Sequence, residues 1–325
     1  MTPGRVELLV PTGFGTRPSG GNIYDRRLRA GLLARGWDVV THELSPLDEV
    51  PLGPGPLLVD SLVTSWAAGT LLGSGATVVP LVHTLFGTPG ERELLAQAPA
   101  VITTSAWMRS QVLADRAVDP RRVFVAEPGA DRVAPATPSA AGGELLCVAT
   151  IARPKGHDVL LDALAQLTEL DWRCTLVGAV DVDPDFVDEL DKAAADAGIN
   201  DRLRFTGALG RTELEAAYRA ADLAVLPTRN ESYGMVVTEA LAHAVPVLAS
   251  AVGGVPEALG DVAGAHPGML VRAGDPDALA STLRRWLTDA PLRSWLQRTA
   301  RERIGSLPWW EQTAATVALA LEVVA

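Results

Sequence analysis

Short apolar runs recur along this chain, and each is followed by a loop and a stretch with helical spacing. The first run, at residues 6–11, leads into a glycine-rich loop at residues 12–22. Residues 23–35 then carry apolar side chains on one helical face, and Gly36 is typical of a C-cap. Strand, glycine loop, helix and strand in this order predict the start of a doubly wound parallel sheet.

The pattern continues, pauses once and starts again. Strand-like runs follow at residues 37–42, 57–60, 77–83, 100–105 and 122–126. Residues 134–143 are rich in Ala, Pro, Ser and Gly without periodicity, which predicts a linker. Beyond it, strand and helix alternate again from residue 144 to a helix at residues 277–286. Because 325 residues favour two domains, we expect an α/β protein with domains at residues 1–136 and 144–306.

Composition narrows the class of protein and its compartment. A hydrophobic content of 48% allows a large core, and a net charge of −11 argues against a nucleic-acid partner. Cys147 and Cys174 lie in apolar runs without metal-ligand spacing, so we expect buried, reduced thiols. The chain shows neither a secretory leader nor an apolar run of about 18 residues. We therefore expect a cytoplasmic protein without an integral membrane segment.

The stretch at residues 230–241 carries the strongest functional signal. Glu231 lies in a loop after the apolar run 223–226, and Glu239 lies in a helix that we expect to begin near Met235. Gly234 has no Cβ, so a ligand can approach the backbone, and the amides of Met235 and Val236 would form a helix N-terminus that binds anions. The pattern favours a nucleotide-sugar site. The alternative is a surface loop followed by a solvated helical glutamate.

The residues around this stretch resemble those of a known family. Glu231 to Glu239 resembles the E-x7-E motif of retaining glycosyltransferases of family 4, and residues 240–250 and 252–257 resemble its next two segments. Ala244 stands where that family usually has glycine. The resemblance implies the GT-B architecture, two facing Rossmann-like domains with a cleft between them. It also implies that a final helix, within residues 307–325, crosses back to complete the N-terminal domain; the alternative is a helix that stays on its own domain.

The resemblance implies roles for the residues of the C-terminal domain. It assigns Glu239 to the ribose hydroxyls and Glu231 to the donor sugar, with the amides near Met235 and Val236 at the phosphates. Lys155 lies where a strand gives way to a helix, and it resembles the family's phosphate-binding lysine. The family often has an arginine where this chain has Thr150, so Arg153 is a candidate to supply that charge.

Two features of the N-terminal domain match the same family. Gly20, Gly21 and Asn22 match its glycine loop, which faces the phosphates, although any tight turn also uses glycine. His83 ends a strand at the carboxyl edge of the sheet, where ligands bind in such folds. The resemblance places this histidine near the transferring sugar and the acceptor, where an ordinary pKa would let it orient or deprotonate a hydroxyl. The alternative is a structural histidine bonded to backbone.

One short acidic motif is open to two interpretations. Asp181 and Asp183 look like the metal-binding D-x-D of another glycosyltransferase architecture. Asp183 followed by Pro184 fits a helix cap better, with proline at the first helical position. We therefore predict no metal site, no cofactor and no metal requirement at the chemical step.

Together these features predict a retaining, hexosyltransferase-type glycosyltransferase of class EC 2.4. Its catalytic candidates are His83, Glu231 and Lys155, and its partners are a nucleoside diphosphate sugar and a small-molecule or glycolipid acceptor. The alternatives are a GT-B epimerase acting on a nucleotide sugar and a non-catalytic nucleotide-sugar binding module. The sequence leaves the base (UDP, GDP or dTDP), the sugar, the acceptor and the oligomeric state open. Four arginines on residues 23–35 also leave peripheral membrane association open, although a solvated face explains them as well.

Overall fold

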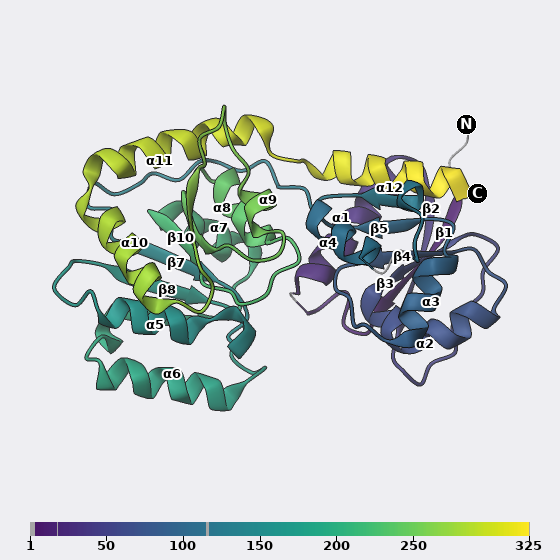
Figure 1. Ribbon diagram of the computed structural model, residues 1–325, viewed down its shortest axis with the longest axis horizontal. Helices are drawn as coiled ribbons and strands as arrows, with labels where there is room; N and C mark the ends of the chain where they lie inside the picture. Colours follow the sequence, from purple (N-terminus) through teal and green to yellow (C-terminus); the bar gives the residue numbers. More distant parts are fainter. Residues whose placement is uncertain (1–3, 18, 115–116, 325) are drawn as a thin grey trace. The chain divides into compact units, whose positions relative to one another are not determined.

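A computed structural model describes residues 4–17, 19–114 and 117–324, and it divides into two units (Figure 1). Unit 1 spans Met1–Gly129 and Pro308–Ala325, and unit 2 spans Ala130–Leu307. Each unit is built on one six-stranded sheet in which every pairing between neighbouring strands is parallel. We describe each unit separately.

Unit 1 has the strand order β2-β1-β3-β4-β5-β6. Its elements are β1 (Arg5–Pro11), α1 (Gly20–Ala34), β2 (Asp38–Leu44), β3 (Leu57–Asp60), α2 (Ser61–Gly73), β4 (Val78–Val82), α3 (Pro89–Gln97), β5 (Val101–Thr103), α4 (Ala106–Leu113), η1 (Pro120–Arg122), β6 (Val123–Val125) and α12 (Trp310–Val324). Helices cover both faces of the sheet, so β3 and β4 are buried along their whole length. This explains why the strands appear in the sequence as continuous apolar runs.

Helix α1 begins earlier than the sequence predicted. Gly20, Gly21 and Asn22 form its first turn rather than part of a loop. The cause is Ser19, whose side-chain oxygen accepts a hydrogen bond from the Asn22 amide at 3.1 Å and so caps the helix. The helix ends at Ala34 and Gly36 follows with a positive φ, as the C-cap prediction required.

The last helix, α12, belongs to unit 1. It begins at Trp310, three residues after the predicted start, and packs along α1. The approach is close, because a Cβ added to Gly31 would lie 2.5 Å from the Cβ of Ala314. Trp310 also meets the ring of Tyr24 edge to face at 5.7 Å, and Tyr24 donates a 2.8 Å hydrogen bond to the carbonyl of Ala126. The helix therefore closes the core of unit 1.

Unit 2 has the strand order β12-β11-β10-β7-β8-β9. Its elements are β7 (Glu144–Val148), η2 (Arg153–Lys155), α5 (His157–Ala165), β8 (Arg173–Val177), α6 (Pro184–Asp196), η3 (Asn200–Arg202), β9 (Leu203–Gly207), α7 (Arg211–Ala220), β10 (Leu223–Leu226), α8 (Met235–Ala242), β11 (Val247–Ser250), α9 (Val255–Leu259), β12 (Gly268–Val271), α10 (Pro276–Thr288), α11 (Ala290–Arg303) and η4 (Ile304–Ser306). The main core lies between the sheet and helices α5, α6, α10 and α11. Both cysteines are buried in this core as free thiols, which confirms that prediction.

The segment predicted as a linker is attached to unit 2. The Ser139 amide and hydroxyl donate to the Asp222 carboxylate at 2.5 and 2.6 Å, and the Trp286 indole donates to the Gly142 carbonyl at 2.7 Å. The division between the units falls earlier, between Gly129 and Ala130. Proline and glycine content alone did not reveal these contacts, because their partners lie about 80 or more residues away.

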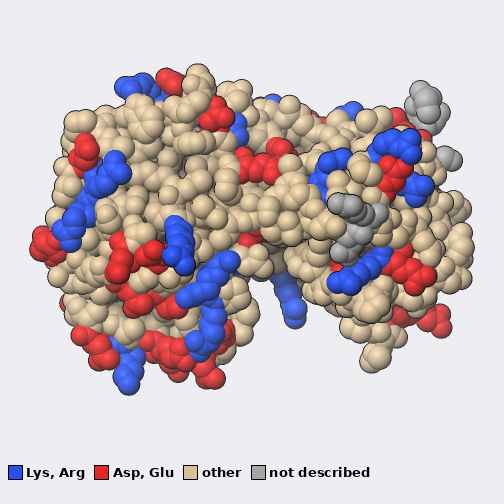
Figure 2. Space-filling model, viewed as in Figure 1, with Lys and Arg blue, Asp and Glu red and all other residues tan. Residues whose placement is uncertain are grey.

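The surface carries both signs of charge. Figure 2 shows basic and acidic side chains interspersed on the face drawn there, rather than gathered by sign. Several arginines of α1 bond within the protein; the Arg29 guanidinium, for example, donates to the Thr41 hydroxyl at 2.9 Å. Among the helices in the described part of the chain, none is long and apolar enough to cross a membrane.

Candidate functional site

The candidate donor site lies at one edge of the sheet of unit 2. Strands β7, β10 and β11 are neighbours and run parallel, so the loops that leave their carboxyl ends lie together. The order of the strands also reverses between β7 and β10, and ligands bind at such switch points in open α/β sheets. The loop after β7 carries Lys155, and the loop after β10 carries Glu231.

These two loops are joined by an ion pair. The Lys155 ammonium lies 2.8 Å from the Glu231 carboxylate, and the two side chains are 31% and 21% exposed. A partly open cation beside a carboxylate can contact a bound anion and a hydroxyl at the same time. The structure therefore brings together two residues that lie 76 positions apart and that the sequence assigned to one site.

Two glycines allow the loops to approach this closely. Gly156 has a φ of +73°, and an added Cβ would lie 2.2 Å from the Pro227 carbonyl oxygen after β10. Gly253, after β11, has a φ of +54°, and its Cβ would lie 1.7 Å from the carbonyl oxygen of Glu231. Any larger side chain at either position would push the loops apart, so these glycines set the position of Lys155 and Glu231.

Arg229 fastens the same two loops from the outside. Its guanidinium forms a two-pronged pair with Asp158 at 2.8 and 2.6 Å and donates to the Arg153 carbonyl at 2.8 Å. The Arg229 amide donates to the Pro154 carbonyl at 2.8 Å. This clamp could not be predicted from the sequence, because the partners of Arg229 lie in a different loop.

Helix α8 begins at Met235, as predicted, directly after Gly234. Met235 and Val236 occupy its first turn, where backbone amides have no carbonyl partner within the helix. Both residues are partly exposed. This helix N-terminus is therefore suited to binding an anion such as a phosphate.

Glu239 lies one turn further along α8 and is held by a residue that the sequence analysis did not identify. The hydroxyl of Tyr218, on α7, donates to the Glu239 carboxylate at 2.9 Å. The Tyr218 ring is buried and stacks on the ring of His243 with centroids 4.8 Å apart. Burial, together with the nearby charge of Glu239, raises the pKa of Tyr218 well above its ordinary value, so the hydroxyl remains a donor.

Arg153 turns toward α6. Its guanidinium lies 2.7 Å from Glu189, 3.8 Å from Asp183 and 4.9 Å from the centre of the Phe186 ring. Its backbone begins the 3-10 helix η2. Asp183 also caps α6, because its carboxylate accepts a hydrogen bond from the Phe186 amide. This confirms that Asp183 is a helix cap.

His157, which follows the loop that carries Lys155, is fully buried at the start of α5. Neither ring nitrogen has a hydrogen-bond partner with acceptable geometry. Burial lowers the pKa of His157 to about 4, and Asp158 offsets only part of this effect. The imidazole is therefore neutral near pH 7 and packs as part of the core.

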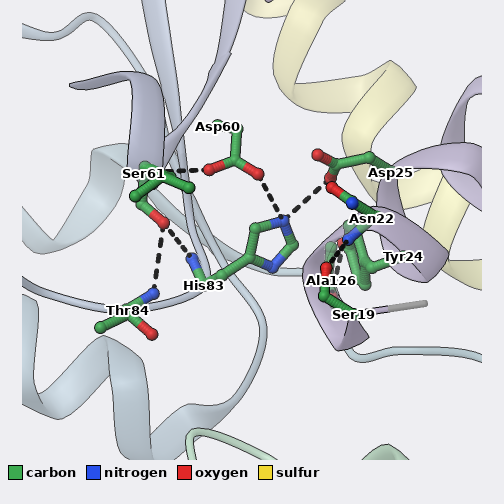
Figure 3. Close-up of polar contacts among 10 residues, drawn as sticks. Ser19, Asn22, Tyr24, Asp25, Asp60, Ser61, His83, Thr84 and Ala126 are labelled. Atoms are coloured by element: carbon green, nitrogen blue, oxygen red, sulfur yellow. Dashed lines mark hydrogen bonds and ion pairs between the residues drawn. The ribbon is translucent and has the colours of Figure 1, made fainter. Parts of the chain in front are cut away.

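His83, in unit 1, has a different environment from the one expected. Its Nε2 atom lies 2.8 Å from the Asp25 carboxylate and 3.8 Å from that of Asp60 (Figure 3). Burial lowers the pKa of His83, but Asp25 and Asp60 more than offset burial and raise it to about 9. The pKa of this histidine is therefore not the ordinary value that a role as a base near pH 7 would require.

The glycine loop residues of unit 1 lie beside this histidine. Gly21 is close to it, since an added Cβ would lie 3.5 Å from the His83 ring and 3.8 Å from Asp60, whereas Gly20 faces open space. The Asn22 side chain donates to the carbonyls of Gly13 and Arg17 at 3.3 and 3.1 Å, so it braces the loop that precedes α1.

Asp25 and Asp60 escaped the sequence analysis, although each carried a signal. Asp25 lies three residues before Leu28 and seven before Leu32, so it occupies the buried stripe of α1. Asp60 ends the apolar strand β3 at the carboxyl edge of the sheet and caps α2. With His83 they form a group whose ligand atoms lie within 4.8 Å of one another, the one group of metal-binding type in the described part of the chain.

Two parallel six-stranded sheets with helices on their faces, together with a strand-edge site containing Lys155 and Glu231, define a GT-B-like glycosyltransferase structure. The family model "Glycosyl transferases group 1" matches residues 141–303, about half of the chain. The chain belongs to this family, and the matched residues cover almost all of unit 2.

Curated relatives agree in their names. The chain is 36% identical over 238 residues to a D-inositol 3-phosphate glycosyltransferase of Frankia alni, covering 68% of this chain and 58% of that protein. It is 31% identical over 281 residues to one of Mycolicibacterium gilvum, covering 75% and 61%. The chain thus spans between about half and three fifths of the length of the curated relatives it matches.

Solved structures share the fold over nearly the whole chain. HepE of Anabaena in complex with UDP-glucose has a TM-score of 0.81 at 18% identity, covering 98% of this chain and 99% of that one. Sucrose-phosphate synthase of Thermosynechococcus elongatus has a TM-score of 0.78 at 22% identity, covering 97% of each chain.

Proposed function

We propose that this protein transfers a sugar from a nucleoside diphosphate sugar to an acceptor hydroxyl with retention at the anomeric carbon. One observation carries the proposal: the 2.8 Å pair of Lys155 and Glu231 joins the loop after β7 to the loop that leads from β10 to the α8 N-terminus. A cation and helix amides suit a diphosphate, and a neighbouring carboxylate suits sugar hydroxyls. Glu239, held by Tyr218, then takes the ribose hydroxyls.

We propose a uridine nucleotide as the donor. The support is that HepE, which shares the fold, was solved in complex with UDP-glucose. For the acceptor, the names of the curated relatives make D-inositol 3-phosphate the first compound to assay. A glycolipid acceptor at a membrane surface is the second candidate to assay.

The chemical step follows from the charges. When the glycosidic bond breaks, negative charge grows on the departing diphosphate, and Lys155 with the amides of Met235 and Val236 stabilises that charge. His83 Nε2 lies 2.8 Å from Asp25 and is engaged there. The departing phosphate oxygen takes the acceptor proton, on the same face of the sugar that the acceptor attacks, and retention results.

We further propose that this step needs no divalent metal. The diphosphate is met by an ammonium and by helix amides, which supply the charge stabilisation that a metal supplies elsewhere. In the part of unit 2 that the structure describes, no three His, Cys, Asp or Glu side chains converge as metal ligands do. Arg153 is left with a secondary role, since its guanidinium is already paired with Glu189.

The test is release of nucleoside diphosphate from a panel of UDP-, GDP- and dTDP-sugars, with and without D-inositol 3-phosphate or a glycolipid acceptor. We expect acceptor-dependent release and a product whose anomeric proton coupling matches that of the donor. A parallel incubation with donor alone tests the epimerase alternative, which would yield a new epimer and no free diphosphate. Binding of donor with no release for any acceptor would refute transfer and favour a binding module.

A further inference from the structure

Three side chains from three elements of unit 1 converge at the carboxyl edge of its sheet. Asp25 comes from α1, Asp60 from the end of β3, and His83 from the loop after β4. In Figure 3 both carboxylates point toward the imidazole of His83. Asp25 is fully buried and Asp60 is 4% exposed, so bulk water does not solvate either carboxylate.

The two carboxylates of this group share one basic partner, His83, and burial together with the charge of Asp25 raises the pKa of Asp60 to about 7. Among the described residues, no arginine or lysine forms an ion pair with Asp25 or Asp60, and His83 alone faces both. The Oδ2 atom of Asp25 is buried and has no hydrogen-bond partner. A buried carboxylate oxygen with no partner is costly, so it indicates a missing positive group.

A second buried acid in the same unit shows the contrast. Glu7 is 1% exposed and pairs with His42 at 2.8 Å, as Asp25 pairs with His83. Glu7 also accepts from the Arg5 guanidinium at 2.8 Å, so both of its oxygens are satisfied. The Asp25 group has the same acid–histidine pair but a second carboxylate where Glu7 has an arginine.

The spacing of the three ligands fits one ion. Ligands at about 2.1 Å from a metal lie about 3.0 Å apart in an octahedral site and about 3.4 Å apart in a tetrahedral one. The observed separations from His83 Nε2 are 2.8 Å to Asp25 and 3.8 Å to Asp60, which bracket these values. The carboxylate oxygens of Asp25 and Asp60 lie within 4.8 Å of each other, so the three side chains can turn toward one ion.

We infer that Asp25, Asp60 and His83 form a binding site for a divalent first-row transition-metal ion. Two carboxylate oxygens and one imidazole nitrogen are the donors that zinc and manganese accept, whereas magnesium and calcium prefer oxygen alone. The ion ties α1, the β3–α2 junction and the β4 loop together, and so stabilises unit 1. It takes no part in binding the diphosphate, and the inference stands whether or not sugar transfer is the activity.

The experiment uses the full-length, untagged protein after treatment with chelator and dialysis at pH 8. Isothermal titration with ZnCl2 or MnCl2 should show one site per chain with a Kd of about 10 μM or below. MgCl2 should bind at least 10-fold more weakly. Asp25→Asn should weaken zinc binding by 100-fold or more, and His83→Gln provides an independent loss of a ligand if Asp25→Asn fails to fold.

Glu7→Gln is the matched control, because it removes a buried acid that is paired with histidine in the same unit; its zinc affinity should equal that of the wild type. Zinc at 100 times its Kd should also raise the melting temperature of the wild type and of Glu7→Gln by about 5 °C or more, and should leave that of Asp25→Asn unchanged. No binding by the wild type up to 1 mM would overturn the inference and leave protons as the neutralising groups. Equal binding by the wild type and both ligand variants would overturn it as well.

Discussion

Lys155 and Arg153 should contribute unequally to turnover, although both are cations of one loop. Lys155 points to Glu231 at 2.8 Å, within the site, whereas Arg153 is paired with Glu189 at 2.7 Å on the side of α6. Replacing Lys155 by alanine removes the charge that meets the diphosphate. It also leaves the Glu231 carboxylate without its partner beside an anionic substrate, so repulsion adds to the loss.

The magnitude follows from the strength of one charged hydrogen bond. A loss of about 1.5–3 kcal/mol corresponds to about a 10- to 150-fold fall in kcat/KM. We expect Lys155→Ala at or beyond the upper end, and Arg153→Ala at or below the lower end. Both side chains are at least 31% exposed, so each substitution should cost less than about 1 kcal/mol in the free energy of unfolding.

The assay is acceptor-dependent release of nucleoside diphosphate, measured as kcat and KM, with a thermal melt of each variant. Lys192, the other lysine of the chain, lies exposed on α6, and Lys192→Ala is the matched control, expected to behave as the wild type. Glu231→Gln introduced into Lys155→Ala should restore part of the lost activity, because it removes the unpaired charge.

Two results would refute this reasoning. If Arg153→Ala is the more damaging variant, Arg153 leaves Glu189 on binding and is the main clamp. If neither variant changes kcat/KM by more than about threefold, the diphosphate is held elsewhere.

Four further outcomes are expected. Glu239→Ala should weaken binding of nucleotide sugar and of free nucleoside diphosphate alike by about 10- to 100-fold, and Tyr218→Phe, which leaves the carboxylate in place, by about 3- to 10-fold in the same titration. The rate of sugar transfer at 25 °C should change little when EDTA is added, measured under conditions in which product release does not limit the rate. Ala244 has a φ of +58°, so Ala244→Gly should raise the free energy of unfolding by about 0.5–1 kcal/mol, whereas Ala242→Gly within α8 should lower it. Burial holds the pKa of His157 at about 4, below its ordinary 6.5, so its contribution to stability is present above about pH 6.5 and is lost as the pH falls toward 4. Between pH 7 and 4.5 the wild type should therefore lose about 2–3 kcal/mol more, in denaturant titrations, than His157→Leu.

Each of these has a clear contrary result. Unchanged affinity of Glu239→Ala for the free nucleotide would remove Glu239 from the ribose. Complete loss of activity in EDTA that manganese restores at once, without a change in melting temperature, would place a metal in the chemical step. A less stable Ala244→Gly would mean that the Ala244 methyl group packs well enough to outweigh its backbone strain. Parallel pH profiles for the wild type and His157→Leu would show that His157 does not titrate in this range.

The fold could be predicted because parallel strands covered on both faces must be apolar along their length. The predicted runs at residues 57–60 and 223–226 match β3 and β10 to the residue. Lys155 and Glu231 could be placed in one site for a related reason, since each follows a strand and those strands are neighbours in the sheet. Sequence alone could not show that the two side chains touch.

Of the remaining features, the start of α1 depends on a local cap and the others depend on contacts between distant segments. Glycine-rich residues 20–22 indicated a loop because glycine is a poor helix former, and the single hydrogen bond from the Asn22 amide to Ser19 decided otherwise. The direction of Arg153 depended on acidic residues of α6, and the pKa of His83 on Asp25, 58 positions away. Such pairings leave no local trace in a single sequence.

The place of α12 in unit 1 has a consequence for synthesis on the ribosome. One face of α1 includes Gly31 and the ring of Tyr24. This face stays uncovered until Trp310 and Ala314 are made, and these are translated about 280 residues after Gly31. At about 5–20 residues per second, the interval between Gly129 and Trp310 alone lasts about 10–40 s. Unit 2 is continuous in the chain and is synthesised during that interval. The nascent protein therefore exposes an unfinished apolar groove on its first-made half, and the chance of mispairing with another chain is greatest then.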